Sequence, residues 1–494
     1  MLRGIAIVLA LVALLAAAAE LYLRSRERAH WRRAETAAER ELLGGGLQGL
    51  LRARALALGG ASAGDDAEPA ATIALASAML ASEYGLSEAE AARAAADAVE
   101  TAPRASQRAH SLKLASRALV EVVSGHLDQA EALARQSVSL GHKQASPLFV
   151  LGRVRFRQGN LAAASHAFQA ALVREPNFIE ARVSWAEVWL EQGEPERAKE
   201  NLLQALRYTP DHGRAQLLLA EVDAAAVGGK AVSVPWEATC ARDEAKSSFI
   251  AGACALARAQ RAARSHDGTE AVRWAEAAGR GRPLEPRVLG GAAQVLAALG
   301  EVDRASVCLQ EATLIASPSL PSLRWAKVAV ELGRGQLVDL ADAPKVASSP
   351  WAPIFLARNA LASGGIKAVS ALLRGLPLDS PQIDAIAFLT KSEVNPTAAA
   401  ASPADPFHTY LKGMQARLGG KTSVAADLLS TALEEHGDAC RAAGEYLAAR
   451  RELGRGGDDN ALAWLRRENV HCVNLPALGA DKSRARKGAD QVSH

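Results

Sequence analysis

The feature that most constrains the fold of this chain is a repeat of 34 residues between residues 111 and 212. Small residues and prolines recur at this interval, with Gly159 returning as Gly193, Ala164 as Ala198, Ala171 as Ala205 and Pro176 as Pro210. Gly125 and Ala130 continue the same phase one period earlier. A period of about 20–50 residues is typical of stacked repeats, in which each unit packs on its neighbours. The sequence therefore predicts consecutive repeats over 111–144, 145–178 and 179–212.

Each repeat is expected to form a helical hairpin. A glycine at the middle of the repeat can take the left-handed conformation that ends the first helix. The closing proline ends the second helix, because proline cannot continue a helix interior. The repeat 145–178 resembles the tetratricopeptide repeat (TPR), and the residues that carry this resemblance are Leu151, Gly152, Ala164, Phe168, Ala171 and Pro176. The resemblance implies an all-α, TPR-like α-solenoid of stacked helical hairpins.

The resemblance also implies a binding surface, since the first helix of each TPR hairpin lines a concave groove. The groove positions of two repeats are Ser146, Phe149, Arg153, Phe156 and Arg157, then Glu180, Val183, Glu187, Leu190 and Glu191. The candidate peptide-groove residues are Phe149, Arg153, Phe156, Arg157, Val183, Glu187 and Leu190. An extended or helical peptide that carries both charges would suit this surface. The chaperone-binding clamp is not expected, because Phe149 and Arg153 stand where that clamp needs Lys and Asn. The alternative is that these side chains contact the chain's own later hairpins.

The N-terminus predicts a transmembrane anchor over residues 5–23. This stretch of 19 residues is apolar except for Glu20 and is long enough to span a bilayer as a helix. Tyr22 sits at the expected membrane interface, and a run of arginines follows at positions 24, 26, 28, 32 and 33. The positive-inside rule then favours a cytoplasmic array and a single-pass protein of a bacterial inner membrane. A cleaved signal peptide ending near Ala19, with a periplasmic array, is the alternative.

The rest of the chain divides at changes of composition. The expected parts are the anchor or signal peptide (1–23), a juxtamembrane helix and linker (24–69), an N-terminal TPR array (70–226), a degenerate TPR-like array (236–390), C-terminal TPR-like hairpins (405–475) and a disordered basic tail (476–494). Residues 227–235 and 395–406 are the linkers between the arrays. Gly85 and Gly300 mark the turns of degenerate hairpins.

The sequence contains no recognisable catalytic or metal-binding motif. The Gly420-Lys421-Thr422 triplet lacks the first glycine of a phosphate-binding loop, because that position holds Gln415. The five cysteines form no C-x-x-C pair, so buried or inert thiols are expected, with Cys240–Cys254 and Cys440–Cys472 as disulfides if the domain is exported. We expect no enzyme activity and no cofactor. The net charge of +3, from 57 basic and 54 acidic residues, gives no reason to expect nucleic acid.

These features predict a membrane-tethered TPR scaffold or adaptor that binds other proteins, with a role in cell-envelope biogenesis or assembly. In layout the chain resembles the lipopolysaccharide assembly protein family, which has one N-terminal helix followed by TPRs. That family ends in a rubredoxin-like module with paired C-x-x-C motifs, and this chain has none. The resemblance therefore covers the anchor and the repeats only. The alternatives are an exported periplasmic TPR assembly factor and an enzyme whose site lies in a helical shell without a motif.

Overall fold

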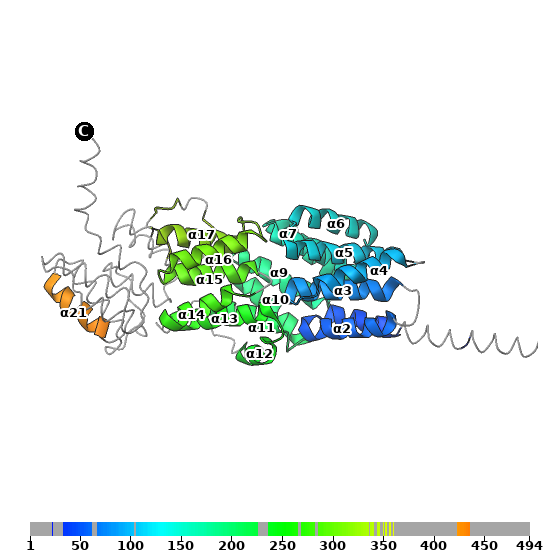
Figure 1. The fold of residues 1–494 in the computed structure, drawn as a ribbon, viewed down its shortest axis with the longest axis horizontal. Helices are drawn as coiled ribbons and strands as arrows, with labels where there is room; N and C mark the ends of the chain where they lie inside the picture. Colours follow the sequence, from blue (N-terminus) through cyan, green and yellow to red (C-terminus); the bar gives the residue numbers. More distant parts are fainter. Residues whose placement is uncertain are drawn as a thin grey trace, which may run out of the picture. The chain divides into compact units, whose positions relative to one another are not determined.

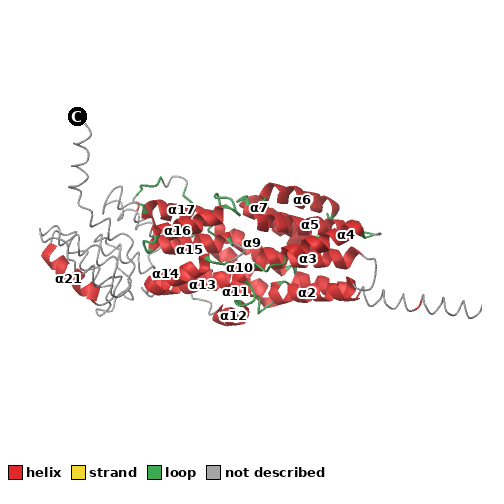
Figure 2. Ribbon diagram, in the orientation of Figure 1, coloured by secondary structure: helices red, strands yellow, loops and turns green. Residues whose placement is uncertain are grey.

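The computed structural model describes residues 33–61, 67–102, 105–225, 236–264, 268–281, 285–334 and 422–434, with Tyr22 and short stretches between 336 and 359. Every regular element in this part of the chain is an α-helix, as expected (Figure 2). The contacts divide the chain into two compact units. Unit 1 comprises Met1–Val188 and Glu200–Gln216, and unit 2 comprises Trp189–Lys199 and Leu217–His494.

Unit 1 is a stack of helical hairpins (Figure 1). Its helices are α2 (Gly46–Ala61), α3 (Ala67–Tyr84), α4 (Ala89–Thr101), α5 (Gln107–Ser124), α6 (Leu127–Leu140), α7 (Ala145–Arg157) and α8 (Leu161–Arg174), followed by parts of α9 (Ile179–Glu191), α10 (Pro195–Tyr208) and α11 (Gly213–Ala225). Helices α3 to α10 reproduce the hairpins that the sequence repeat predicts.

The glycines of the repeat end the first helix of each hairpin. Gly125, Gly159 and Gly193 have φ angles of 81°, 77° and 69°, the left-handed region that only glycine enters without strain. After α5, the N–H of Gly125 donates to the carbonyl of Val122, which satisfies a carbonyl at the helix end. Helix α8 ends at Arg174, just before Pro176. These boundaries confirm the roles expected for glycine and proline in the repeat.

Aromatic and small side chains alternate in the core of unit 1. Phe149 is fully buried, and its ring centroid lies 6.0 Å from that of Phe168 and 5.1 Å from that of Phe178. A side chain at Gly152 would begin 2.6 Å from the Phe168 ring, so the close approach of α7 and α8 requires glycine at this position. Ala164 and Ala171 are also fully buried. The small residues of the repeat therefore set the distance between the two helices of a hairpin.

The N-terminal part of unit 1 differs from the expected juxtamembrane helix and linker. Residues 33–44 are helical, but Ala38 and Leu42 are buried rather than solvated. Arg108 of α5 binds Glu35 at 2.7 Å and Glu39 at 2.9 Å. Helix α2 follows and packs beside α3 (Figure 1). The sequence pattern does not predict α2, because its glycines and alanines are as typical of a linker as of a closely packed helix.

Unit 2 also consists of helical hairpins. Besides the remainders of α9 to α11 it contains α12 (Trp236–Asp243), α13 (Ser248–Arg264), α14 (Gly268–Gly279), α15 (Pro286–Ala298), α16 (Val302–Thr313), α17 (Pro321–Gly333) and α21 (Thr422–Glu434). Gly300 has a φ angle of 90° and forms the turn between α15 and α16 that the degenerate repeat predicts. Thr422 of the Gly-Lys-Thr triplet is the first residue of α21.

Among the residues that the structure describes, no helix is both long and apolar enough to cross a bilayer. The expected anchor over residues 5–23 lies outside the described residues except for Tyr22, whose side chain is exposed. The linkers 227–235 and 395–406, the tail 476–494 and most of the C-terminal hairpins also lie outside them.

Candidate functional site

A group of charged and polar side chains is buried inside unit 1. It combines the C-terminal end of α3 with side chains from α7, from α9 and from the start of α11. We call it the central ionic cluster, and its members are Glu83, Tyr84, Arg153, Glu180, Glu187, His212 and Arg214. Six of these residues are less than 9% exposed. The seventh, Arg214, has a side chain that is 10% exposed and pairs with the fully buried Glu83. Burial of so many charges is costly unless each finds a partner, so their pairing decides whether the arrangement is stable.

The pairs of the cluster connect equivalent positions of successive repeats. Arg153 and Glu187 are 34 residues apart, and the Arg153 Nη1 atom lies 2.6 Å from the Glu187 Oε2 atom. Glu180 and Arg214 are also 34 residues apart, with Arg214 Nη1 2.7 Å from Glu180 Oε2. One repeat thus supplies the counter-charge for the next. The repeat period itself generates the ion pairs, because the stacking of hairpins brings equivalent positions together.

Helix α3 joins this network through the carboxylate of Glu83. That carboxylate accepts a hydrogen bond from Arg153 Nε at 2.9 Å and lies 2.7 Å from Arg214 Nη1. Arg214 in turn binds Glu187 at 2.8 Å. The two guanidinium groups therefore bridge the three carboxylates, as the forked geometry of arginine allows. The guanidinium of Arg153 also lies over the ring of Phe156, 5.4 Å from its centroid.

Glu180 is the most connected acceptor of the cluster. Its Oε1 atom accepts the Tyr84 hydroxyl at 2.5 Å and lies 3.2 Å from His212 Nε2. Because His212 Nδ1 accepts the backbone N–H of Ala215 at 3.2 Å, the ring hydrogen is on Nε2 and points to Glu180. Burial by itself raises the pKa of Glu180, but His212, Arg214 and the Tyr84 hydroxyl outweigh burial and hold the pKa well below its ordinary value. The carboxylate is therefore ionised at neutral pH.

The neighbouring groups are held in fixed protonation states as well. Burial, and then the negative charge of Glu180, raise the pKa of Tyr84 well above its ordinary value. Burial lowers the pKa of Arg214, but Glu187, Glu83 and Glu180 outweigh it and raise that pKa. The phenol stays protonated and the guanidinium stays charged at all physiological pH values. Such groups are suited to binding and orienting other groups rather than to exchanging protons.

The structure places the expected peptide-groove residues in the interior. Phe149, Arg153, Phe156, Arg157, Val183, Glu187 and Leu190 are all less than 9% exposed. Phe149 packs in the aromatic core, while Arg153 and Glu187 belong to the central ionic cluster. Their observed contacts are with the chain itself, which is the alternative interpretation of the sequence. Binding of a peptide by these residues stays a prediction.

Several members of the cluster were not singled out by the sequence. The sequence places Glu180 in the groove but does not single out Glu83, Tyr84, His212 or Arg214. Opposite charges at a spacing of one repeat, as in Glu180 and Arg214, are a signal that could have identified one pair. The participation of α3 has no such signal, because Glu83 and Tyr84 lie 70 or more positions before their partners in the chain.

Unit 2 contains a smaller arrangement of the same kind. The Glu191 carboxylate, which the sequence assigned to the groove, accepts the backbone N–H of Ser322 at 2.8 Å. Arg287 lies 3.7 Å from Glu191 and 2.7 Å from Glu221. Burial raises the pKa of Glu191, and Arg287 and Ser322 offset only part of this effect. The acidic groove position Glu191 is thus partly compensated by contacts within unit 2.

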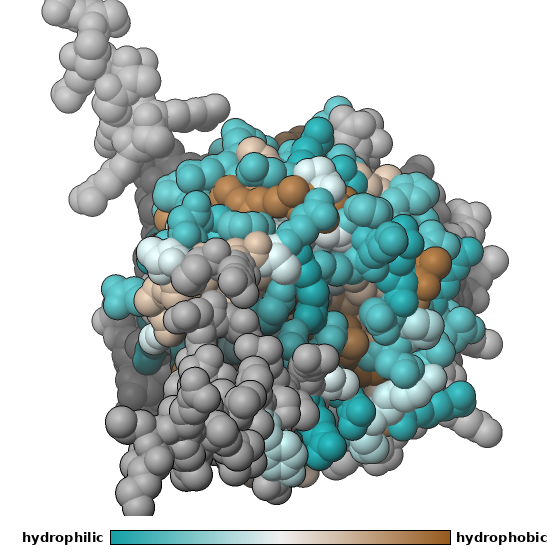
Figure 3. Space-filling view, turned by 90° about the vertical axis from the view of Figure 1, so that its right-hand side faces the viewer, coloured by the Kyte–Doolittle hydropathy of each residue, from teal (hydrophilic) through white to brown (hydrophobic). Residues whose placement is uncertain are grey.

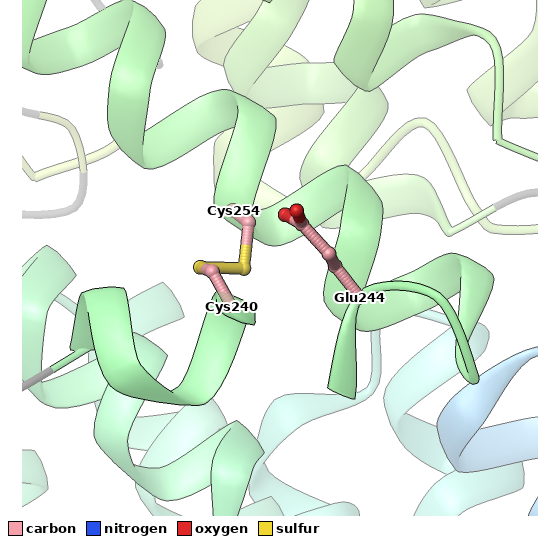
Figure 4. Close-up of side chains that lie close together, drawn as sticks. All are labelled: Cys240, Glu244 and Cys254. Atoms are coloured by element: carbon pink, nitrogen blue, oxygen red, sulfur yellow. A yellow bond between two sulfur atoms is a disulfide. The ribbon is translucent and has the colours of Figure 1, made fainter. Parts of the chain in front are cut away.

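Cys240 and Cys254 form a disulfide that joins α12 to α13 (Figure 4). This corrects the expectation of free thiols at these two positions and agrees with the pairing expected for an exported domain. Cys308 is a buried free cysteine, and Cys440 and Cys472 lie outside the described residues. Glu244 lies beside the disulfide, and the three side chains are close enough to hold a metal ion. With both sulfur atoms in the disulfide, no thiolate is available to bind a metal.

Hydrophobic residues do not form a broad patch on the face shown in Figure 3. Hydrophilic residues predominate among its coloured atoms, and the hydrophobic ones form separate small areas. The exposed large apolar side chains include Val173 of α8 and Tyr208 of α10, which are 75% and 56% exposed. Both belong to the second helix of a hairpin, whereas the central ionic cluster draws on first helices. Single exposed apolar residues of this kind are normal on a protein surface.

Stacked helical hairpins whose equivalent positions pair across the stack define a helical repeat protein. Two family models described as tetratricopeptide repeat match the chain, one over residues 116–178 and the other over residues 155–222. Residues 116–222 are therefore tetratricopeptide repeats, as the sequence period predicted. The matched segment contains Arg153, Glu180, Glu187, His212 and Arg214.

The comparison with solved structures gives weak global similarities. The TPR domain of P58(IPK) is 13% identical over 78% of this chain and 100% of that chain, with a TM-score of 0.24. A structure described as Naa15/Naa10 bound to HypK-THB is 13% identical over 89% of this chain and 68% of that chain, also with a TM-score of 0.24. Similarity at this level establishes neither a shared function nor a shared partner. No curated protein sequence matches the chain.

Proposed function

We propose that this protein is a membrane-tethered TPR scaffold that mediates protein–protein interactions during assembly of the cell envelope. The observation that carries the proposal is the run of tetratricopeptide repeats over residues 116–222. Stacked repeats offer an extended surface in which each hairpin contributes a small part. The paired and fixed charges of the central ionic cluster support a rigid, non-catalytic role. No cofactor is part of the proposal.

The tether is the apolar stretch over residues 5–23, which has the length of a bilayer-spanning helix. Arg108 fixes the described helix over residues 33–44 to α5 through Glu35 and Glu39. In this proposal only the short segment between residues 23 and 33 separates the array from the membrane.

We place the array on the periplasmic side of a bacterial inner membrane. The support for this orientation is the Cys240–Cys254 disulfide, because disulfides persist in oxidising compartments and are rare in the cytosol. The arginines after residue 23 favour the opposite orientation. We give the disulfide more weight, because the positive-inside rule is a statistical bias. Reduction of the bond would also remove the covalent link between α12 and α13.

The partner-binding surface is expected on the second helices of the hairpins. The inner positions of unit 1 are occupied by the chain's own contacts, whereas Val173 and Tyr208 are exposed on α8 and α10. A photo-reactive amino acid at either position, in the full-length protein in its membrane, should give discrete adducts with other proteins. Gln107, exposed at the start of α5, a first helix, is the control position. Adducts with lipid alone, or equal adducts from Gln107, would contradict the scaffold proposal.

An exported assembly factor without an anchor is the second candidate. The disulfide favours it equally, and Ala17-Ala18-Ala19 provides a signal-peptide cleavage site. The mass of the mature N-terminal peptide separates the two candidates. A start at Met1 or Leu2 supports the anchor, and a start near Glu20 supports the exported form.

A further inference from the structure

The turn that precedes α2 is inserted into a polar site at the edge of the central ionic cluster. The backbone N–H of Gly46 donates a hydrogen bond to Glu180 Oε1 at 2.9 Å. The hydroxyl of Thr209 donates to the backbone carbonyl of Gly44 at 3.0 Å. The side chain of His212 lies against Gly46. A segment near the N-terminus is thus recognised by residues far along the sequence, from α9 and from the loop before α11.

Glycine is required at two positions of this turn. Gly45 and Gly46 have φ angles of 65° and 73°, which other residues rarely adopt. A Cβ atom on Gly45 would also lie 3.1 Å from Glu180 Cγ. Gly44 is different, because a Cβ atom there would meet nothing within 4 Å. The site therefore selects for a turn with two consecutive glycines, and Gly44 provides a matched control in the same turn.

The site does not depend on this turn for its own charge balance. If Gly46 withdrew, Glu180 would keep its contacts with the Tyr84 hydroxyl, His212 and Arg214. The buried carboxylate would not become an unpaired charge, which is the usual reason that removing a buried partner unfolds a protein. The turn behaves as a ligand added to an organised site.

The rest of α2 is covered on one side only. Leu47, Leu50, Ala53 and Ala57 are buried, and α2 packs chiefly beside α3. The opposite side of α2 is exposed and includes Leu56 and Leu58, which are 36% and 51% exposed. Arg54 also pairs with Glu88, the residue before α4. A helix that is covered on one side only is among the parts of a fold that open most easily.

We infer that Glu180, Thr209, His212 and the flank of α3 form a docking site for a helix that begins with a Gly–Gly turn, and that α2 occupies this site reversibly. A partner helix of the same chemistry, with a glycine turn followed by a Leu/Ala stripe, enters only after α2 leaves. Docking of α2 needs no partner. The inference therefore goes beyond the scaffold role and can fail or succeed independently of it.

The test uses the full-length protein and a fluorescent peptide of residues 33–61. In the wild-type protein the site is occupied by α2, so the peptide should bind weakly. The Gly46→Val variant cannot form the turn, so its site should be vacant and bind the peptide at least about tenfold more tightly, because occupancy lowers the apparent affinity. The Gly44→Ala variant should bind like the wild type. A peptide that itself carries Gly46→Val should not bind the vacated site.

Hydrogen exchange of α5 to α10 shows whether unit 1 remains folded in the Gly46→Val variant. Loss of protection throughout these helices would overturn the inference, because α2 would then be part of the cooperative core. Failure of the peptide to bind a folded variant would overturn it as well. A second preparation, cleaved after folding at a protease site inserted between Ala61 and Ala67, should exchange its N-terminal segment for the labelled peptide. No exchange over the same period would contradict reversible docking.

Discussion

Arg153 and Glu187 hold the same position in two successive repeats, and their side chains pair at 2.6 Å inside unit 1. Neither side chain is more than 9% exposed. The opposite charges at a spacing of 34 residues thus have a structural role. They join one hairpin to the next, and they draw in α3 through Glu83.

Loss of one member of this pair should destabilise unit 1 strongly. Arg153→Met leaves buried carboxylates with less counter-charge, and removal of one partner of a buried pair costs about 3–5 kcal/mol. Arg135→Met is the control, because Arg135 is paired with Glu131 one turn away but is 65% exposed. An exposed pair of this type contributes about 0.3–0.5 kcal/mol. Denaturant unfolding of both variants measures the difference.

The double variant Arg153→Met/Glu187→Leu tests whether the pair acts through charge. It should recover part of the stability that Arg153→Met loses, since apolar residues of similar volume often replace buried ion pairs with little cost. If the double variant instead loses the sum of the stability losses of Arg153→Met and Glu187→Leu, Glu187 acts mainly through its other partner, Arg214.

The stability of unit 1 should fall in acid because of Glu180. The pKa of Glu180 is lowered in the folded state, so its contribution is fully present above the unfolded pKa of about 4.3 and is lost as pH falls towards the folded pKa. Denaturant unfolding between pH 7 and pH 3 should therefore show a steeper loss for the wild type than for Glu180→Gln. Glu90→Gln, at an exposed position of α4, should keep the wild-type profile. Parallel profiles of stability against pH for all three proteins would contradict this role of Glu180.

Gly152→Ala should destabilise unit 1 even though alanine favours helices. The added methyl would lie 2.6 Å from the Phe168 ring, and overpacking of this kind costs about 1–3 kcal/mol. Phe168→Leu in the same chain should restore part of the loss by freeing space. The control is Gly59→Ala on α2, where nothing lies within 4 Å and the change should be neutral or stabilising by up to about 1 kcal/mol. Thermal unfolding of the three variants is the measurement.

Reduction of the Cys240–Cys254 disulfide should loosen α12 in unit 2. The cysteines are 14 residues apart, and closure of a loop of about this length contributes roughly 3 kcal/mol through the unfolded state. Cys240→Ser/Cys254→Ser should match the reduced wild type and should not respond to reductant. Hydrogen exchange should locate the change in α12 and α13. In cells, acid-quenched alkylation followed by peptide mapping should recover the linked pair, and free thiols there would contradict the periplasmic placement.

The candidate site illustrates what a periodic sequence can predict. The period predicts that Phe149, Arg153, Glu180 and Glu187 face the same way, because every repeat presents the same offsets to the same side, and all four are buried. It could not show what covers that side. Glu83 and Tyr84 of α3 contact Arg153, Glu180 and Arg214, which lie at least 70 positions later in the chain. No local pattern in the sequence links segments so far apart.

The sequence alone determined the helical repeat class, the hairpin boundaries and the positions of the turn glycines. These features are local: a glycine that allows a left-handed turn, a proline that ends a helix, and a period that repeats them. Only the tertiary structure decided that α2 is a docked helix rather than a linker, that charged groove positions neutralise one another, and that Cys240 meets Cys254. Each of these depends on segments that are distant in the chain, and the energy of such contacts appears only once the hairpins have stacked.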